Sequence, residues 1–155
     1  IMKSSKLLKI IKEELKDYPI NYLKNKVTDD RYKDPLVKKL AKYNSQAYDE
    51  IYSIEIDEDF DIKDEVIKKM KSDINYYFDM YAGGDIETRE FTKYISLYLA
   101  LIAKKPLHPY SHDKKDDVYE LDNSYYCKVR MKAIHDKKSL CRYCVCQNVG
   151  YMGLF

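Results

Sequence analysis

Hydrophobic residues recur at intervals of three and four through the first 105 residues, which is the spacing of helices that bury one face. The first such stretch begins at Ser4 or Ser5, either of which is suited to cap a helix, and it ends or kinks at Pro19. A short second helical piece extends to Val27. The apolar face of the first helix comprises Leu7, Leu8, Ile11, Leu15 and Tyr18.

Two longer helices are predicted next. Asp34 followed by Pro35 indicates an N-cap and a proline in the first turn. Asp61 is the predicted cap of the following helix, which ends at the glycine pair 83–84. The apolar stripe of the first of these helices is Leu36, Leu40, Tyr43, Ala47 and Ile51. That of the second is Ile62, Val66, Ile67, Met70, Ile74, Tyr77, Phe78 and Tyr81.

A further helix is predicted from Asp85 to the residues before Pro106. Residues 94–103 are apolar almost all round yet too few to cross a bilayer, which predicts a buried central helix. Beyond Pro106, the strand-like segments 118–121 and 125–129 flank a turn and indicate a β-hairpin.

The predicted fold is therefore mainly α, a helical bundle of four to five helices with a small C-terminal β-hairpin and a cysteine metal knuckle. We expect residues 1–155 to form a single domain, in which a helical body (1–105) carries a metal-binding appendage (106–155).

The cysteines carry the most specific chemistry in the sequence, and all four fall within the last 29 residues. Cys141 and Cys144 form a Cys-x-x-Cys pair, whose tight turn directs two thiolates to one point. Cys127 is the expected third ligand, because residues 125–129 resemble a strand that can lie beside this pair. Three thiolates and one further donor complete a tetrahedral site, and zinc is the metal that these ligand types favour.

Two residues compete for the fourth place. Cys146 is near in sequence, but three ligands within six residues crowd the chain. His108 comes from a separate segment, which Pro106 and Pro109 stiffen. The predicted metal ligands are therefore Cys127, Cys141, Cys144 and His108, with Cys146 as the alternative fourth ligand.

Other interpretations fit the same cysteines. Four cysteines are the usual ligands of an iron–sulfur cluster, which would make this a redox protein. Without a metal, the thiols would be buried small apolar groups or a disulfide or redox pair. A disulfide framework is less expected, because small secreted domains spread their cysteines along the chain. Residues 1–12 also lack the unbroken apolar region of a signal peptide, and no run of 18 apolar residues predicts a membrane span.

Charge gives a weaker indication. The net charge of +2 does not suggest nucleic-acid binding overall, yet the C-terminal 29 residues carry six cations against the single acid Asp136. These cations either balance a thiolate metal centre or form a basic docking surface. They are Lys128, Arg130, Lys132, Lys137, Lys138 and Arg142. In the second case the protein would be a nucleic-acid-binding zinc module, with Tyr125, Tyr126 or Tyr143 stacked on bases.

Three segments carry a resemblance to a known family. Residues 91–109, 125–129 and 140–144 resemble an archaeal protein family, known mainly from methanogens and catalogued as a domain of unknown function. The matched segments contain His108, Cys127, Cys141 and Cys144. The resemblance implies a cytoplasmic, anaerobic setting in which thiols stay reduced. It implies no activity.

The predicted function is that of a cytoplasmic metal-binding protein with a structural zinc ion, acting through a protein partner or as a homo-oligomer. A site closed by four protein ligands leaves no position for a substrate, which favours a non-enzymatic role. The absence of a phosphate loop, a dinucleotide fingerprint and a nucleophile elbow points the same way.

Overall fold

A computed structural model describes residues 1–82, 85–130 and 139–149. Within them the fold is mainly helical with a small C-terminal sheet, which confirms the predicted fold class at that level. The predicted glycine stop at 83–84 lies outside the described residues. The helices are α1 (Ser4–Leu15), α2 (Ile20–Thr28), α3 (Pro35–Ser53), α4 (Asp64–Tyr77) and α5 (Ile86–Leu97). Two π-helical segments, η1 (Phe78–Ala82) and η2 (Tyr98–Ala103), extend α4 and α5.

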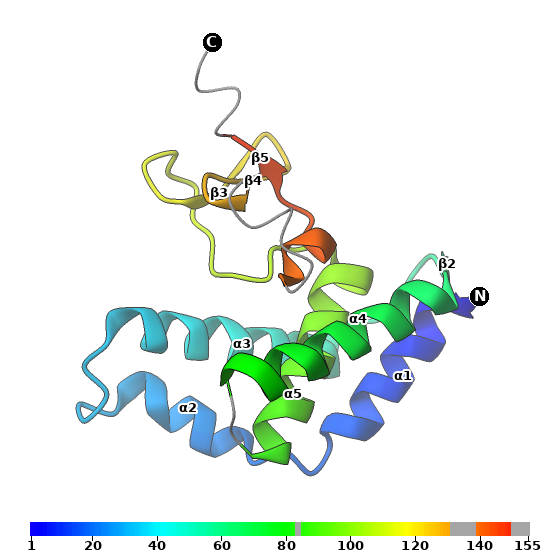
Figure 1. Ribbon diagram of the computed structural model, residues 1–155, viewed down its shortest axis with the longest axis horizontal. Coiled ribbons are helices and arrows are strands. Elements are labelled where there is room, and N and C mark those ends of the chain that lie inside the picture. The colour runs from blue at the N-terminus through cyan, green and yellow to red at the C-terminus, as the bar shows by residue number, and fades with distance from the viewer. Residues whose placement is uncertain (83–84, 131–138, 150–155) are drawn as a thin grey trace.

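The central helix is α5 with its extension η2, as the apolar run 94–103 predicts. Helix α5 packs against α1, α3 and α4, and Figure 1 shows it running through the middle of the helical body. Leu97 and Tyr98 have no exposed surface at all, and most of their neighbours in the segment are buried too. Burial of large side chains on every side of this helix places it at the centre of the hydrophobic core that the described residues form.

The start of α1 departs from the prediction. Lys3 occupies the N-cap position without a side-chain bond, so neither Ser4 nor Ser5 caps the helix. Both serine hydroxyls instead donate to the carboxylate of Asp59, at 2.7 and 2.6 Å. The acidic segment around Asp59 is therefore fastened to the first turn of α1. Strands β1 (Met2–Lys3) and β2 (Asp61–Ile62) pair antiparallel beside this contact.

Helices α3 and α4 correct two further predictions. Asp34 caps α3 as expected, accepting a hydrogen bond of 2.9 Å from the Leu36 amide. Leu36 and Leu40, however, are 74% and 39% exposed, because the buried positions of α3 lie at Ala41, Ser45, Ala47 and Ile51. The N-cap of α4 is Lys63, since Asp61 lies in β2.

The C-terminal sheet contains the predicted hairpin with a tighter turn. Strands β3 (Val118–Leu121) and β4 (Ser124–Cys127) pair antiparallel. Asp122 and Asn123 both have positive φ, which makes the connection a two-residue turn and places Ser124 in the strand. A short strand, β5 (Gln147–Asn148), pairs parallel to β4, so the cysteine-rich segment returns to the hairpin.

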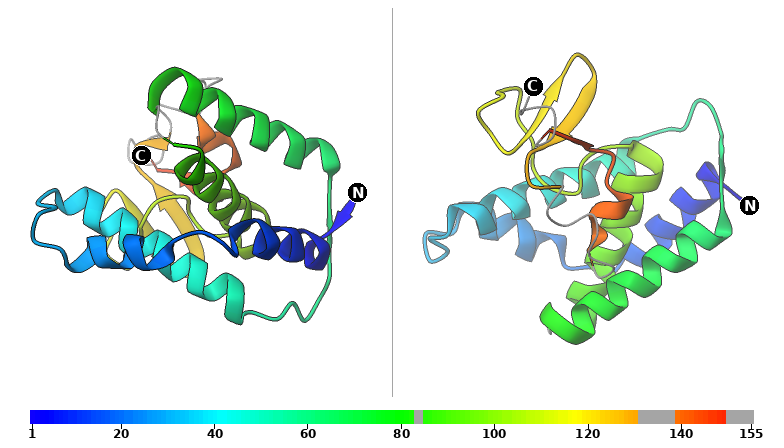
Figure 2. Two further views of the ribbon diagram at one scale, coloured as in Figure 1. Left: turned by 90° about the horizontal axis from the view of Figure 1, so that it is seen from below. Right: turned by 45° about the horizontal axis from the view of Figure 1, so that its top comes forward.

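The sheet is attached to the helices through the segment before it and the segment after it. The Tyr43 hydroxyl donates to the Pro106 carbonyl at 2.6 Å. A 3-10 helix, η3 (Leu140–Tyr143), contacts α4, and Leu140 and Tyr143 pack on the helical core. Figure 2 shows η3 between the helices and the strands. In the described part of the chain, no helix combines the length and apolar character that crossing a membrane requires.

Candidate metal centre

One cavity of about 640 Å³ lies between the helices and the C-terminal sheet, and we call it the cysteine cavity. All five sulfur and imidazole donors predicted from the sequence line it: Cys127, Cys141, Cys144, Cys146 and His108. They come from three stretches of chain, the segment after Pro106, the end of β4, and residues 140–146, which we call the cysteine segment. Its opposite wall includes Leu40, Tyr77, Tyr81, Ile95 and Leu99.

Cys127 sits at the end of β4 in a turn that supports its sulfur. The backbone N–H groups of Val129 and Arg130 donate to the thiol. Burial raises the pKa of Cys127, and these two hydrogen bonds act in the opposite direction because they favour the thiolate. The amides two and three positions beyond the cysteine thus favour its thiolate form.

The cysteine segment forms a second turn of this kind. The hydroxyl of Ser139 accepts a hydrogen bond from the Cys141 amide at 3.1 Å, and the Cys144 amide donates to the Cys141 carbonyl at 3.2 Å. The Cys144 sulfur accepts hydrogen bonds from the Cys146 thiol and from the amides of Cys146 and Leu107. The thiol bond from Cys146 is the largest cause of a lowered pKa at Cys144. The same contact and burial raise the pKa of Cys146.

Exposure separates the two candidates for the fourth ligand. Cys146 is 3% exposed and its thiol contacts that of Cys144. His108 is exposed at the edge of the cavity and lowers the pKa of Cys144 only through its charge. Both residues line the cavity, but Cys146 is the one in direct contact with another predicted ligand.

Asp73 of α4 anchors the cysteine segment, and the sequence gives no indication of this role. The Arg142 guanidinium donates to its carboxylate through Nη2 at 2.5 Å, and the Tyr143 hydroxyl donates to the same oxygen. Arg142 and Tyr143 are the two residues between the cysteines of the Cys-x-x-Cys pair. A single side chain of the helical body therefore fixes the turn that carries two of the predicted ligands.

The predicted donors share a cavity without converging on one point. Among the described residues, no three histidine, cysteine, aspartate or glutamate side chains lie close enough together to hold a metal ion. All four thiols are free. The arrangement brings the donors to one place, and coordination of a single ion would require side-chain rotation within the cavity.

Three of the six predicted cations lie in the described residues, and each has an internal contact. The Lys128 ammonium lies 5.8 Å from the centre of the Tyr119 ring, and Arg130 donates to the Asn148 side chain at 3.3 Å. Arg142 pairs with Asp73. The other three, Lys132, Lys137 and Lys138, lie outside the described residues.

Comparison with known proteins agrees with the resemblance carried by residues 91–109, 125–129 and 140–144. Residues 3–149 match the family described as "Uncharacterized protein conserved in archaea (DUF2115)". The chain belongs to this DUF2115 family. It is 30% identical over 161 residues to the UPF0305 protein MJ0646 of Methanocaldococcus jannaschii, covering 96% of this chain and 98% of the relative.

A second relative extends the similarity within the methanogens. The chain is 30% identical over 95 residues to the UPF0305 protein MmarC6_0221 of Methanococcus maripaludis, covering 60% of this chain and 57% of the relative. No solved structure matches the chain. The family relationship is thus established, and the chemistry of this DUF2115 protein rests on its own residues.

Proposed function

We propose that this protein binds a metal in the cysteine cavity, with zinc as the first candidate, and that the metal centre is structural. The observation that carries the proposal is the meeting of three separate stretches of chain at one cavity, each bringing a predicted donor. All four cysteines of the chain line this cavity, although the sequence contains other buried positions for a small apolar residue.

The hydrogen bonds to the sulfur atoms support a thiolate site. Metal-binding cysteines are deprotonated, and N–H donors around a ligand sulfur stabilise its negative charge and fix its orientation. Cys127 accepts two such bonds, and Cys144 accepts two from backbone amides besides the one from the Cys146 thiol. A buried cysteine that only fills space needs none of them.

For the ligand set we propose Cys127, Cys141, Cys144 and a fourth donor. The sequence places His108 first, because a ligand from a separate segment avoids crowding. The contacts support Cys146, whose thiol touches that of Cys144 and whose side chain is buried while His108 is exposed. With four protein ligands the coordination shell is closed, so the metal would hold the sheet and the helices together and the protein would act through a partner.

An iron–sulfur cluster is the second candidate, and a specific observation favours it. Among the described residues the donors are not gathered around one point, and the cavity of about 640 Å³ has room for more than one atom. A cluster bridges cysteines that are farther apart than the ligands of a single zinc ion. Either metal centre requires reduced thiols, and for this reason we place the protein in a reducing cytoplasm.

Metal analysis of protein purified without oxygen tests the proposal. We expect about one zinc per chain and no visible absorption for a zinc site, whereas a brown protein with iron and sulfide would identify the cluster. Cys141→Ser and Cys144→Ser should each remove the metal. His112→Ala, at an exposed histidine that contacts Glu120, is the matched control and should retain it.

Two variants identify the fourth ligand. Cys146→Ser should remove the metal and His108→Ala should leave it bound. The opposite pair of results would give the place to His108. Purified wild-type protein with neither zinc nor iron, and with no uptake of either when they are added, would refute the metal centre altogether.

A further inference from the structure

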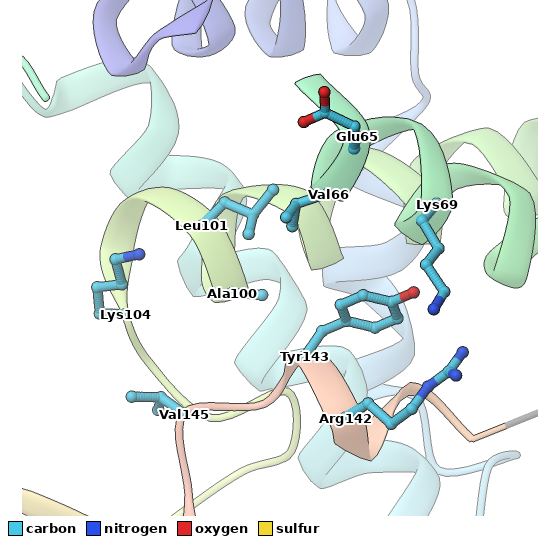
Figure 3. Close-up of a pocket in the computed structure, with 9 residues that line it drawn as sticks. All are labelled: Glu65, Val66, Lys69, Ala100, Leu101, Lys104, Arg142, Tyr143 and Val145. Carbon is cyan, nitrogen blue, oxygen red and sulfur yellow. The ribbon is translucent and has the colours of Figure 1, made fainter. Parts of the chain in front are cut away.

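A second cavity, of about 590 Å³, lies on the other side of the cysteine segment, and we call it the lysine cavity. Figure 3 shows its apolar floor and the charged side chains around it. Val66 of α4 and Leu101 of η2 contribute to the floor, and Val145 and the Tyr143 ring complete it from the cysteine segment. The cavity is open to solvent.

Cations stand on opposite sides of this floor. Lys104 lies at one side in Figure 3, and Lys69 and Arg142 lie at the other. Asp73 neutralises Arg142. Among the described residues, neither Lys69 nor Lys104 has a carboxylate within salt-bridge distance; the Lys104 ammonium lies 5.5 Å from the Phe60 ring centre.

The lining carboxylate, Glu65, lies near Val66 and above the floor in Figure 3. The two lysines therefore form an incompletely balanced rim around an apolar surface. Lysines that lack a carboxylate partner, beside an apolar floor, complement a ligand that carries both acidic and apolar groups.

We propose that the lysine cavity is the docking site for a segment of a partner protein in which an apolar side chain is flanked by acidic residues. The apolar side chain fits the floor, and the flanking carboxylates reach Lys69 and Lys104. A small anion is less suited, because the two lysines do not converge on one point. Nucleic acid would meet the lysines but would leave the apolar floor without a complementary group.

The inference rests on the proposed function, since it names the kind of partner through which a metal-binding protein would act. The link is built into the chain: Cys141, Cys144 and Cys146 line the cysteine cavity, whereas Arg142, Tyr143 and Val145 line the lysine cavity. Residues of the cysteine segment thus line both the cysteine cavity and the lysine cavity. A metal that fixes the segment would also fix the docking site.

Selection from a random-peptide phage library against the protein as purified, with its metal content measured, tests the proposal. We expect enriched peptides with an apolar residue between acidic ones. Their synthetic forms should bind at least about tenfold more weakly to the double variant Lys69→Glu/Lys104→Glu. Lys68→Glu is the control: it makes one such Lys-to-Glu change on the exposed surface of α4, away from the cavity lining, and should have little effect.

Glu65→Gln provides a test of opposite sign. It removes the carboxylate that repels an acidic ligand, so the same peptides should bind more tightly, a gain that misfolding does not produce. The proposal is overturned if no acidic-apolar peptides are enriched, or if Lys68→Glu weakens binding as much as the double variant does. It is also overturned if a poly(U) oligonucleotide binds through the two lysines while the peptides do not.

The metal content of the same samples keeps this proposal separate from the metal centre. The double variant should retain about one metal per chain while losing the peptide, since neither lysine lines the cysteine cavity. Wild-type protein that binds the peptides but never binds metal would refute the metal centre and leave the docking site intact.

Discussion

Removal of the Asp73 carboxylate should release the cysteine segment while leaving the helical body folded. In Asp73→Ala, the Arg142 guanidinium and the Tyr143 hydroxyl lose their shared acceptor. Arg142 and Tyr143 lie in η3, which contains no carboxylate that could replace Asp73. The Nε atom of Arg142 is already buried without a hydrogen-bond partner. The buried residues of the helical core all lie between positions 7 and 102, and the cysteine segment contributes only the partly buried Leu140 and Tyr143 at its surface.

The structure sets the size of the effect. Hydrogen bonds to a charged group contribute about 1.5–3 kcal/mol each when they are buried. The Asp73 and Arg142 side chains are 21% and 25% exposed, so solvent reduces the contribution moderately. For the two bonds together we expect a loss of about 2–4 kcal/mol in the free energy that keeps the segment docked, or roughly 30- to 1,000-fold in its opening equilibrium.

Native-state hydrogen exchange measures this opening. The Cys144 amide, which donates to the Cys141 carbonyl, should exchange faster in Asp73→Ala by the factor given above, while amides in the middle of α5 keep their rates. Metal affinity should fall by a similar factor, because the metal-bound state needs the docked segment. Asp79→Ala is the control: Asp79 pairs with Arg89 at 2.7 Å but is 58% exposed, so its loss should cost at most about 1 kcal/mol and leave the cysteine segment unchanged.

Two results would refute this reasoning. If Asp73→Ala and Asp79→Ala changed the exchange rate of the Cys144 amide equally, Asp73 would have no specific role in docking the cysteine segment. If Asp73→Ala instead lowered the protection of α5 as much as that of the cysteine segment, the segment would unfold only with the whole domain.

Two further predictions concern the helical body. Tyr98→Phe should lower the free energy of unfolding, measured in urea, by about 1–2 kcal/mol, because the fully buried hydroxyl donates to Glu50 at 2.5 Å. Tyr52→Phe, at an exposed tyrosine that donates to a backbone carbonyl, should lower it less. An equal loss in the two variants would contradict the role of Glu50. Asp59→Asn should destabilise the protein at neutral pH. Bonds from Ser5 and then Ser4 lower the pKa of Asp59 to about 2, so the carboxylate stabilises the fold above its usual pKa, and this contribution is lost as the pH falls toward 2. The difference in the free energy of unfolding between Asp59→Asn and wild type should therefore narrow between about pH 4 and pH 2. A difference that stays constant down to pH 2 would exclude this mechanism. Asp57→Asn, at an exposed carboxylate two residues away, is the control.

The helices could be predicted from the sequence because each has a long periodic stripe and a clear boundary. Asp34-Pro35 and Asp85 are caps whose side-chain bonds the structure contains. The strands β1, β2 and β5 span two residues each, too few for an alternating pattern, and they form only because distant segments meet. Periodicity places Leu36 in an apolar stripe, but periodicity does not identify what packs on that stripe, and Leu36 is exposed.

In the candidate site, too, the features that are local in sequence can be predicted, and the contacts between distant residues cannot. Cysteine spacing is enough to predict that the cysteines lie near one another, since a Cys-x-x-Cys turn is a local feature, and all of them line one cavity. The groups that contact the cysteine segment or its thiols come from distant parts of the chain or from the backbone, and no pattern of side chains in the sequence predicts them. Asp73 lies 69 residues from Arg142, and the Leu107 amide that donates to Cys144 belongs to a backbone position that any residue except proline would supply.

The cysteine segment lies between the two cavities and is positioned to couple binding at one of them to binding at the other. Its cysteines line one cavity and its intervening residues line the other. A ligand that ordered the segment from one side would therefore change the affinity for a ligand at the other. Coupling between two binding sites is reciprocal: if metal raises peptide affinity by some factor, peptide raises metal affinity by the same factor. Titrating metal with and without the selected peptide measures that factor from both directions. In Asp73→Ala the coupling should change along with both affinities, because the segment would then be undocked until a ligand binds, and the ordering of the segment by the first ligand would favour the second.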